Sequence, residues 1–302
     1  MLAEKHAANE GAAEPGAEAL PRSIWLCADD YGISAAVNQA IRDLLMRGRI
    51  NATSVMVAAP SFHRSEAASL NVLNAGTRRF AIGLHVTLTA PFQPMTKGFR
   101  PGRAGKFLPL MEVLARGMLH LLDKNSLAIE ITTQIEAFVT LFGRTPDFID
   151  GHQHVHLFPQ VREALLDVVK DVAPQAWVRQ CGRAPKPPFG AGVWRFADRK
   201  ALALDALSAK FRALAEARGI KTNPAFAGAY DFTMAPEADF ARLFPGFLQQ
   251  LPSGGVVMCH PGFVDAELER LDPLTKMRER EYAFFAAAAF PEVLRAHGVV
   301  LA

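Results

Sequence analysis

Cysteine is scarce in this chain. Three cysteines occur among 302 residues, and no Cys-x-x-Cys pair is present. An odd, widely spaced set argues against a disulfide framework and a structural zinc knuckle. Cys27 and Cys259 fall inside apolar segments, where a free thiol is usually a small buried side chain. We therefore expect reduced, packed cysteines.

Long hydrophobic runs are also missing. No apolar segment approaches the roughly 18 residues that a membrane-spanning helix needs. Residues 1–22, rich in alanine, glutamate and glycine, lack the apolar centre of a signal peptide. We expect a disordered N-terminal tail over 1–22 and a cytoplasmic protein, with at most peripheral contact at the inner membrane surface.

The chain also lacks a large net charge and several motifs of nucleotide-binding proteins and hydrolases. The formal net charge is +3 with 21% charged residues, too mild for the concentrated basic face of a nucleic-acid-binding protein. The Gly-x-Gly-x-x-Gly and P-loop patterns do not occur, so a nucleotide cofactor has no support. Gly-x-Ser-x-Gly is missing too, which removes the usual serine hydrolase elbow.

Short apolar segments alternate with helical patterns along the rest of the chain. The expected strands are 24–28, 53–58, 80–88, 147–151, 176–179, 255–259 and 298–301. The expected helices are 34–47, 61–74, 107–121, 126–142, 160–172, 198–218, 237–250 and 273–289. This alternation predicts a parallel sheet with right-handed crossovers. We predict a single α/β domain over 23–302, a distorted (β/α) TIM-like barrel, with an open doubly wound sheet as the competing topology.

Candidate metal ligands fall at the ends of these strands. Asp30 follows the first strand, His85 lies in the third, and His152 follows the fourth. Because the C-terminal ends of parallel barrel strands converge on one face, these side chains are expected to meet. One carboxylate and two imidazoles are a common hydrolytic metal set. Asp29, beside Asp30, is then the candidate general base.

Simpler explanations exist for each of these residues. An aspartate pair after a strand often marks a turn, and a histidine in a strand is often a hydrogen-bonded core residue. His154 and His156 are expected to support the site or to pack beneath it. Arg179, at a strand end, would contact substrate or pair with Asp29, and Tyr31 belongs to the same group of substrate-binding or supporting residues.

Four ordered motifs resemble those of the YdjC-like carbohydrate deacetylases, which include chitooligosaccharide deacetylases. They are ADDYG at 28–32, IGLHVTLT at 82–89, DGHQHVHLFP at 150–159 and MCHPG at 258–262. The resemblance implies a distorted (β/α) barrel and one divalent metal ion, Mg²⁺ by likeness to the family, with Zn²⁺ as an option. The family often has His-His-His where this chain has His-Gln-His at 152–154.

The same resemblance assigns roles to individual residues. It implies that Asp30, His85 and His152 hold the metal, that Asp29 is the base, and that His260 of the His-Pro motif is the acid. The expected reaction is removal of an N-acetyl group from an N-acetylglucosamine-type sugar.

Segments 229–233 and 261–268 resemble the branch associated with hopanoid biosynthesis, which implies a lipid-linked substrate. Soluble chitooligosaccharides are the alternative substrate. A metal-dependent phosphoesterase and a non-catalytic carbohydrate- or lipid-binding protein are the rival functions. The residues do not indicate an oligomeric state.

Two irregular segments combine cations with aromatic residues. They are 90–106 and 183–200, with Phe99, Phe107, Phe189, Trp194 and Phe196 in or beside them. Such loops could lie in an anionic membrane interface. Solvated loops with a few packed aromatics are an equally good interpretation.

Overall fold

The computed structural model describes residues 20–76, 79–184, 199–230 and 240–302. Its strands are β1 (Arg22–Tyr31), β2 (Ala52–Val55), β3 (Ala81–Val86), β4 (Phe148–Gly151), β5 (Trp177–Val178), β6 (Phe226–Ala227), β7 (Val256–Cys259) and β8 (Val299–Leu301). Its helices are α1 (Ala35–Met46), α2 (Arg64–Asn74), α3 (Leu110–Met118), α4 (Lys124–Phe142), α5 (Val161–Val172), α6 (Arg199–Glu216), α7 (Phe240–Leu248), α8 (Ala266–Leu271), α9 (Lys276–Ala286) and α10 (Phe290–Ala296). A short 3₁₀ segment, η1 (His152–Leu157), follows β4.

The strands form one parallel sheet in the order β5-β4-β3-β2-β1-β7-β6, and β8 pairs with the start of β1. Strands buried on both faces need continuous apolar runs, and β2, β3, β4 and β7 are buried along their whole length. The two ends of this order also touch. Val178, the last residue of β5, forms a parallel bridge with Thr222, and the amide of Phe226 donates to the carbonyl of Gly182 at 3.0 Å. The predicted distorted (β/α) barrel is confirmed.

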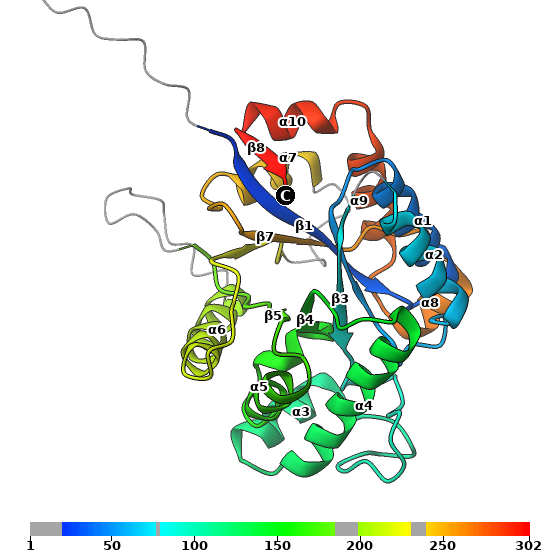
Figure 1. Cartoon of the computed structure of the whole chain (residues 1–302), viewed down its shortest axis with the longest axis vertical. Coiled ribbons are helices and arrows are strands. Elements are labelled where there is room, and N and C mark those ends of the chain that lie inside the picture. The colour runs from blue at the N-terminus through cyan, green and yellow to red at the C-terminus, as the bar shows by residue number, and fades with distance from the viewer. Residues whose placement is uncertain (1–19, 77–78, 185–198, 231–239) are drawn as a thin grey trace, which may run out of the picture.

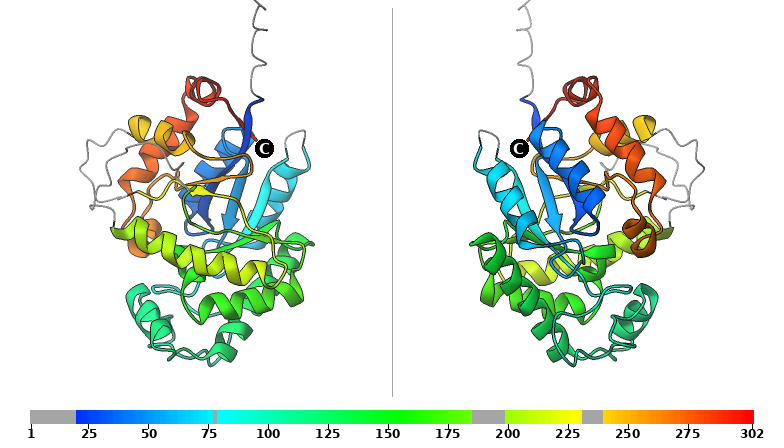
Figure 2. Two further views of the ribbon diagram at one scale, coloured as in Figure 1. Left: turned by 90° about the vertical axis from the view of Figure 1, so that its left-hand side faces the viewer. Right: turned by 90° about the vertical axis from the view of Figure 1, so that its right-hand side faces the viewer.

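Helices surround the strands, with α10 and β8 at one end of the molecule and α3 and α4 at the other (Figures 1 and 2). Local capping agrees with the sequence. The hydroxyl of Ser34 accepts from the amide of Val37 at the start of α1, and Gly143 ends α4 with a φ of 72°.

Several expected boundaries differ from those of the structure. Arg22, assigned to the tail, belongs to β1 and donates to carbonyls of α7 and of the loops after α7 and α10. The helix expected over 107–121 spans only Leu110–Met118, because Phe107 and Leu108 pack into the core before it begins. The helix expected over 273–289 is α9, which ends at Ala286, and α10 follows directly.

The loop between β3 and α3 is tied to α4 by buried polar side chains. Gln134 bonds both the amide and the carbonyl of Thr87, and Glu130 accepts from the amides of Met95 and Thr96. Phe107 is buried and meets Phe99 at a ring-centroid distance of 5.1 Å. Phe107 is therefore a core residue, and Phe99 is partly buried against the core. Whether this loop meets a membrane stays a prediction.

The other expectations about irregular segments concern residues outside the described ranges. They include the tail over 1–19 and the aromatic residues Phe189, Trp194 and Phe196. Within the described part of the chain, no helix has both the length and the apolar composition to cross a bilayer.

Candidate active site

Two adjacent carboxylates lie at the C-terminal end of β1. Asp29 and Asp30 are both about 1% exposed. Asp30 adopts the left-handed region with a φ of 67°, and the pairing of β1 with β2 shifts register between Ala28 and Tyr31. Aspartate tolerates this conformation better than most residues. The irregularity allows consecutive carboxylates to take separate partners at the same end of the barrel.

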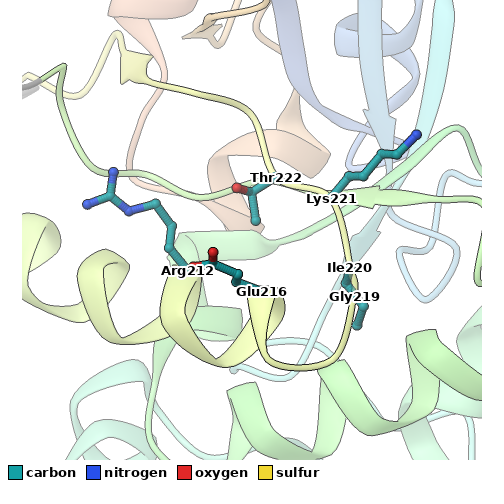
Figure 3. Close-up of a pocket in the computed structure, with 6 residues that line it drawn as sticks. All are labelled: Arg212, Glu216, Gly219, Ile220, Lys221 and Thr222. Carbon is teal, nitrogen blue, oxygen red and sulfur yellow. The ribbon is translucent and has the colours of Figure 1, made fainter.

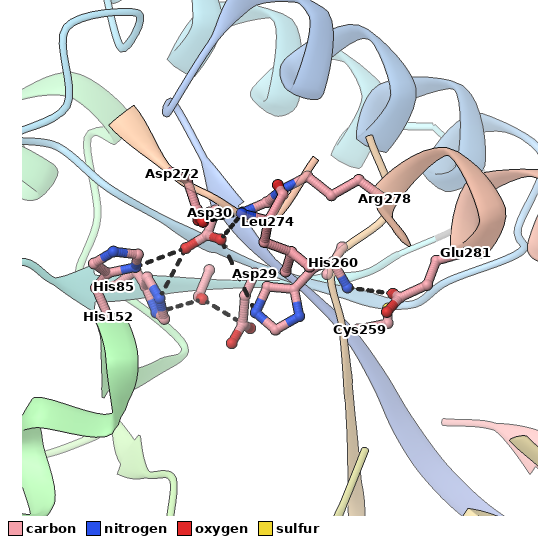
Figure 4. A network of polar contacts seen from close by, with 12 residues as sticks. Asp29, Asp30, His85, His152, Cys259, His260, Asp272, Leu274, Arg278 and Glu281 are labelled. Carbon is pink, nitrogen blue, oxygen red and sulfur yellow. Dashed lines mark hydrogen bonds and ion pairs between the residues drawn. The ribbon is translucent and has the colours of Figure 1, made fainter. Parts of the chain in front are cut away.

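Asp30, His85 and His152 come together around one point (Figure 4). The Asp30 Oδ1 atom lies 2.9 Å from His152 Nδ1 and 3.3 Å from His85 Nε2. One ligand atom from each residue lies within 4.8 Å of the others. Ligands about 2.1 Å from a cation are roughly 3.0–3.4 Å apart in octahedral or tetrahedral geometry. The three side chains therefore fit a divalent metal ion.

The ring of His85 is oriented by its other nitrogen. Its Nδ1 atom lies 2.5 Å from Asp150 Oδ1 and 2.9 Å from the hydroxyl of Ser54. Burial alone would lower the pKa of His85, but the carboxylates of Asp150 and Asp29 raise it to about 10. A carboxylate on one nitrogen that leaves the other facing the cluster is the usual arrangement around a metal-ligating histidine.

The second oxygen of Asp30 is held by α9. Arg278 is fully buried and donates to Asp30 Oδ2 at 2.6 Å and to Asp272 Oδ2 at 2.8 Å. Burial raises the pKa of Asp30, but Arg278 and His152 outweigh burial and keep it well below its ordinary value. Asp30 is thus ionised, with Oδ1 directed toward the imidazoles and Oδ2 committed to Arg278.

Asp29 belongs to a buried ion-pair cluster that adjoins the first one through Asp150 and Ser54. Arg179 donates to Asp29 Oδ1 at 2.8 Å and to Oδ2 at 2.6 Å, and it also lies 2.7 Å from Asp150 Oδ2. Burial acts to raise the pKa of Asp29, but the Arg179 guanidinium holds it well below its usual range. Of the two roles expected for Arg179, the structure places it as the partner of Asp29.

Removing this guanidinium should destabilise the fold. Arg179→Met would leave the buried carboxylates Asp29 and Asp150 without their cation, and we expect a loss of about 3–5 kcal/mol in the free energy of unfolding. The matched control is Arg183→Met, which breaks a half-exposed pair with Asp205 and should cost less than about 1 kcal/mol. Urea unfolding monitored by circular dichroism measures both, and equal losses would contradict the prediction.

His260 lies on the other side of Asp30, just after β7 (Figure 4). Its Nε2 atom is 4.0 Å from Asp30 Oδ2, and its backbone amide donates to Glu281 Oε2 on α9. The phenol of Tyr230 donates to the other oxygen of Glu281. Burial lowers the pKa of His260 to about 4, so this imidazole is neutral near pH 7.

Glu281 should make stability depend on pH. Burial raises its pKa from 4.5 to about 7, so between these values the folded protein holds a proton that the unfolded chain has released. The stabilisation of the folded protein by this bound proton is complete below about pH 4.5. It is lost as the pH rises through about 7.

We therefore compare the protein with Glu281→Gln. The difference in the free energy of unfolding, parental minus variant, should fall by about 2–3 kcal/mol between about pH 5 and pH 8. Glu269→Gln, at an exposed position of α8, is the control and should show no such trend. Parallel pH curves for parent and E281Q in urea unfolding would refute the assignment.

The remaining expected residues take different places. His156 is buried and its Nε2 atom bonds the carbonyl of Arg179 at 2.8 Å, so it packs beneath the site. His154 is partly buried, contacts the Cys181 thiol and meets the Phe226 ring edge-on. Tyr31 is buried, and its hydroxyl contacts Arg42 and Glu66 on α1 and α2 instead of the metal-ligand candidates.

Four supporting residues were not identified from the sequence as part of the site. They are Ser54, Asp150, Arg278 and Glu281. Asp150 stood within a recognised motif, and its place at a strand end could have marked it as a partner of His85. Arg278 and Glu281 lie three residues apart on one helical face, which is a spacing that also occurs on solvated helices.

A pocket elsewhere lies apart from this cluster. It is lined by Arg212, Glu216, Gly219, Ile220, Lys221 and Thr222, at the end of α6 and in the segment that leads into β6 (Figure 3). These residues precede a strand, whereas ligand sites in α/β barrels follow strand ends. We therefore place the candidate active site at Asp30, His85 and His152.

Comparison with curated proteins identifies relatives. A chitooligosaccharide deacetylase from Escherichia fergusonii is 31% identical over 144 residues, which are 47% of this chain and 53% of that protein. The match thus spans about half of that relative's length. A carbohydrate deacetylase from Vibrio vulnificus is 28% identical over 275 residues, covering 90% of this chain and 91% of that protein.

Further comparisons identify a solved structure of the same fold and a family. A proposed cellobiose-phosphate cleavage protein from Enterococcus faecalis has a TM-score of 0.67 at 21% identity, covering 93% of this chain and 97% of that one. This likeness establishes a shared fold. The profile of the YdjC-like protein family matches residues 23–296. The chain therefore belongs to the YdjC-like protein family.

Proposed function

We propose that this protein is a metal-dependent carbohydrate N-deacetylase. The observation that carries the proposal is the meeting of Asp30, His85 and His152 beside a second, ionised carboxylate, Asp29. The names of the relatives from Escherichia fergusonii and Vibrio vulnificus support sugar deacetylation. We infer Mg²⁺ or Zn²⁺ as the metal, since both accept carboxylate oxygen and Zn²⁺ also favours imidazole nitrogen.

Asp30, His85 and His152 would hold the cation. A divalent ion there would polarise the acetamide carbonyl and lower the pKa of a water molecule. Arg278 on Asp30 Oδ2 and Asp150 on His85 Nδ1 keep these two ligands in place. Their role is to fix the ligand geometry before substrate arrives.

Asp29 is suited to receive the proton of the attacking water. Its Oδ1 atom accepts from Arg179, Ser54 and the Cys27 thiol, whereas Oδ2 accepts from Arg179. A carboxylate oxygen has two lone pairs, so Oδ2 keeps one for a proton. The guanidinium fixes the orientation of this oxygen and keeps the carboxylate ionised.

His260 is proposed as the acid that protonates the departing amine. An amine leaves poorly until it is protonated, so a positioned acid accelerates the breakdown step. The imidazole is neutral at rest, so it would first take up a proton from solvent, which the negative charge developing on the substrate oxygen favours by raising its pKa. It would then pass that proton to the amine nitrogen as the C–N bond breaks, while the proton that Asp29 received from the attacking water returns to solvent. Glu281 and Tyr230 hold the backbone that carries it.

Acetate release tests the proposal directly. The purified protein is assayed with chitooligosaccharides, with N-acetylglucosaminyl glycolipids including a hopanoid-linked form, and with a sugar phosphate. Acetate from an N-acetylated sugar supports deacetylation, and the preferred carrier separates a lipid-linked from a free substrate. Phosphate release without acetate would instead establish the rival phosphoesterase. Binding of the sugar without any turnover would establish the non-catalytic alternative.

A further inference from the structure

Exposed apolar side chains concentrate in one part of the molecule. Within the described ranges, half of the large hydrophobic residues that are strongly exposed lie between 95 and 129. They are Met95, Met111, Met118, Leu119, Leu121 and Ile129. The others are scattered singly over distant elements, as is normal for a folded protein. This clustering calls for a physical explanation.

Four of these residues form a local surface on α3 and the turn after it, which we call the α3 patch. Met111 is 69% exposed, Met118 60%, Leu119 69% and Leu121 61%. Met111 and Met118 are seven residues apart and so share one face of the helix. The amide of Leu121 donates to the carbonyl of Arg116 at 2.8 Å, which folds the turn back against the helix.

Cations lie beside the α3 patch in the sequence and in the structure. Arg103 and Arg116 both pair with Glu112 on α3, and Lys106 bridges to Arg103 in the preceding loop. Lys124 begins α4, three residues after Leu121. Residues 95–129 contain six lysines and arginines against two carboxylates, a net charge of +4, whereas the whole chain is +3. The rest of the chain is therefore net −1, and the positive charge is local to this segment.

The α3 patch lies on the same side of the barrel as the candidate active site. The loop that leads from the C-terminal end of β3 to α3 contains Phe92, which meets the His152 ring edge-on at 5.4 Å. Gly117 of α3 packs so closely on the carbonyl of Pro159 that a Cβ atom would come within 2.6 Å of it. Figures 1 and 2 place α3 at the end of the molecule opposite α10.

The composition of the patch favours lipid over protein as its partner. Residues 95–129 carry a net charge of +4, which suits anionic headgroups better than the core of a protein interface, where charged residues are depleted. The aromatic residues Phe99 and Phe107 of this segment are packed against the core or buried and so take no part in the patch. Flexible aliphatic side chains beside lysine and arginine suit a lipid interface, where the apolar groups enter the acyl boundary and the cations meet headgroups.

We propose that the α3 patch docks the protein on an anionic membrane surface. Its apolar side chains would enter the interface, and the neighbouring cations would meet negatively charged headgroups. The contact is peripheral and places the His152 side of the barrel toward the lipid. This inference rests on the surface alone and does not require the proposed deacetylase activity.

Vesicle flotation with the full chain tests the proposal. The probes are phosphatidylcholine vesicles with and without phosphatidylglycerol. Leu119→Ser with Leu121→Ser removes two apolar contacts and should weaken binding to the anionic vesicles about tenfold or more. The matched control is Met46→Ser with Val72→Ser, equally exposed residues on α1 and α2, which should bind like the parent.

A second pair of variants tests the charge. Arg103→Gln with Lys106→Gln should lower binding to anionic vesicles about tenfold. Arg212→Gln with Lys221→Gln, at the distant pocket of Figure 3, should leave binding unchanged. High salt should weaken binding of the parent.

Three results would overturn the proposal. The first is absence of parental binding to either vesicle. The second is an equal loss of binding in the α1/α2 control pair. The third is a parental protein that forms a dimer in light scattering and does not bind vesicles, together with an L119S/L121S variant that is monomeric. That result would assign the patch to contact with a second copy of the chain.

Discussion

Asp29→Asn is expected to retain the metal and to lose turnover by a factor of about 10²–10⁴, the usual contribution of a general base. The asparagine side chain has nearly the same shape as aspartate, and its oxygen can still accept a hydrogen bond from Arg179. The contact with Arg179 is therefore weakened but not lost. The lone pair on Oδ2 is replaced by an N–H that cannot receive a proton. The metal-ligand candidates are separate side chains, and their contacts do not involve Asp29 Oδ2.

The measurements are acetate release and metal content by elemental analysis of the same preparation. Asp205→Asn, which removes a charge from a half-exposed pair with Arg183, is the control and should keep parental turnover. A variant that deacetylates at near parental rate would show that Asp29 is not the base. Loss of both metal and turnover would place Asp29 among the ligands.

His152→Ala is expected to remove the metal itself. It deletes one of two nitrogen donors while Asp30 and His85 keep their supports on Arg278 and Asp150. Since loss of a mere supporting contact lowers metal affinity by 10–100-fold, loss of a direct ligand should cost at least about 100-fold. Activity should fall with the metal and return partly when excess metal is supplied.

His154→Ala is the matched control, because it removes an imidazole two positions along the same 3₁₀ segment. It should keep stoichiometric metal, since the nitrogen that contacts Cys181 lies outside the Asp30 cluster. If H152A keeps stoichiometric metal, the ligand is His154 or His156 and not His152.

The barrel and the gathering of its strand-end residues could be predicted because both follow from simple periodic rules. Parallel strands place their C-terminal ends on one face, so Asp30, His85 and His152 could be expected together from their positions alone. The roles of these residues in catalysis and metal binding stay predictions, to be decided by the variants above.

The supporting residues could not be predicted from the same rules. Arg278 and Glu281 come from α9, whose polar sequence is typical of a solvated helix, yet both side chains are fully buried. Their burial follows from the way α9 packs across the loop after β7, where Gly262 donates to the carbonyl of Arg278. This contact joins the loop after β7 to α9, and no local sequence pattern indicates that these two segments pack together.

The sequence left two interpretations open for the aromatics near α3. Phe99 and Phe107 stand among cations, which suggested an exposed loop, but the polar anchors Glu130 and Gln134 hold this loop against α4 and turn the rings inward. Exposed apolar residues lie instead on α3 and in the turn after it, in the segment that the sequence predicted as a helix over 107–121.

The left-handed turn at Asp30 limits how this centre could be altered by evolution or design. Residues that accept such a backbone are few, chiefly glycine, asparagine and aspartate. A glutamate, the other common carboxylate ligand, would strain the chain there, and an imidazole would lose the anchor to Arg278. We therefore expect a change of preferred ion to be easier to achieve at His85, since no residue of β3 has a left-handed φ. His152 is more restricted, because Gln153 and His154 directly after it have φ values of 54° and 58°.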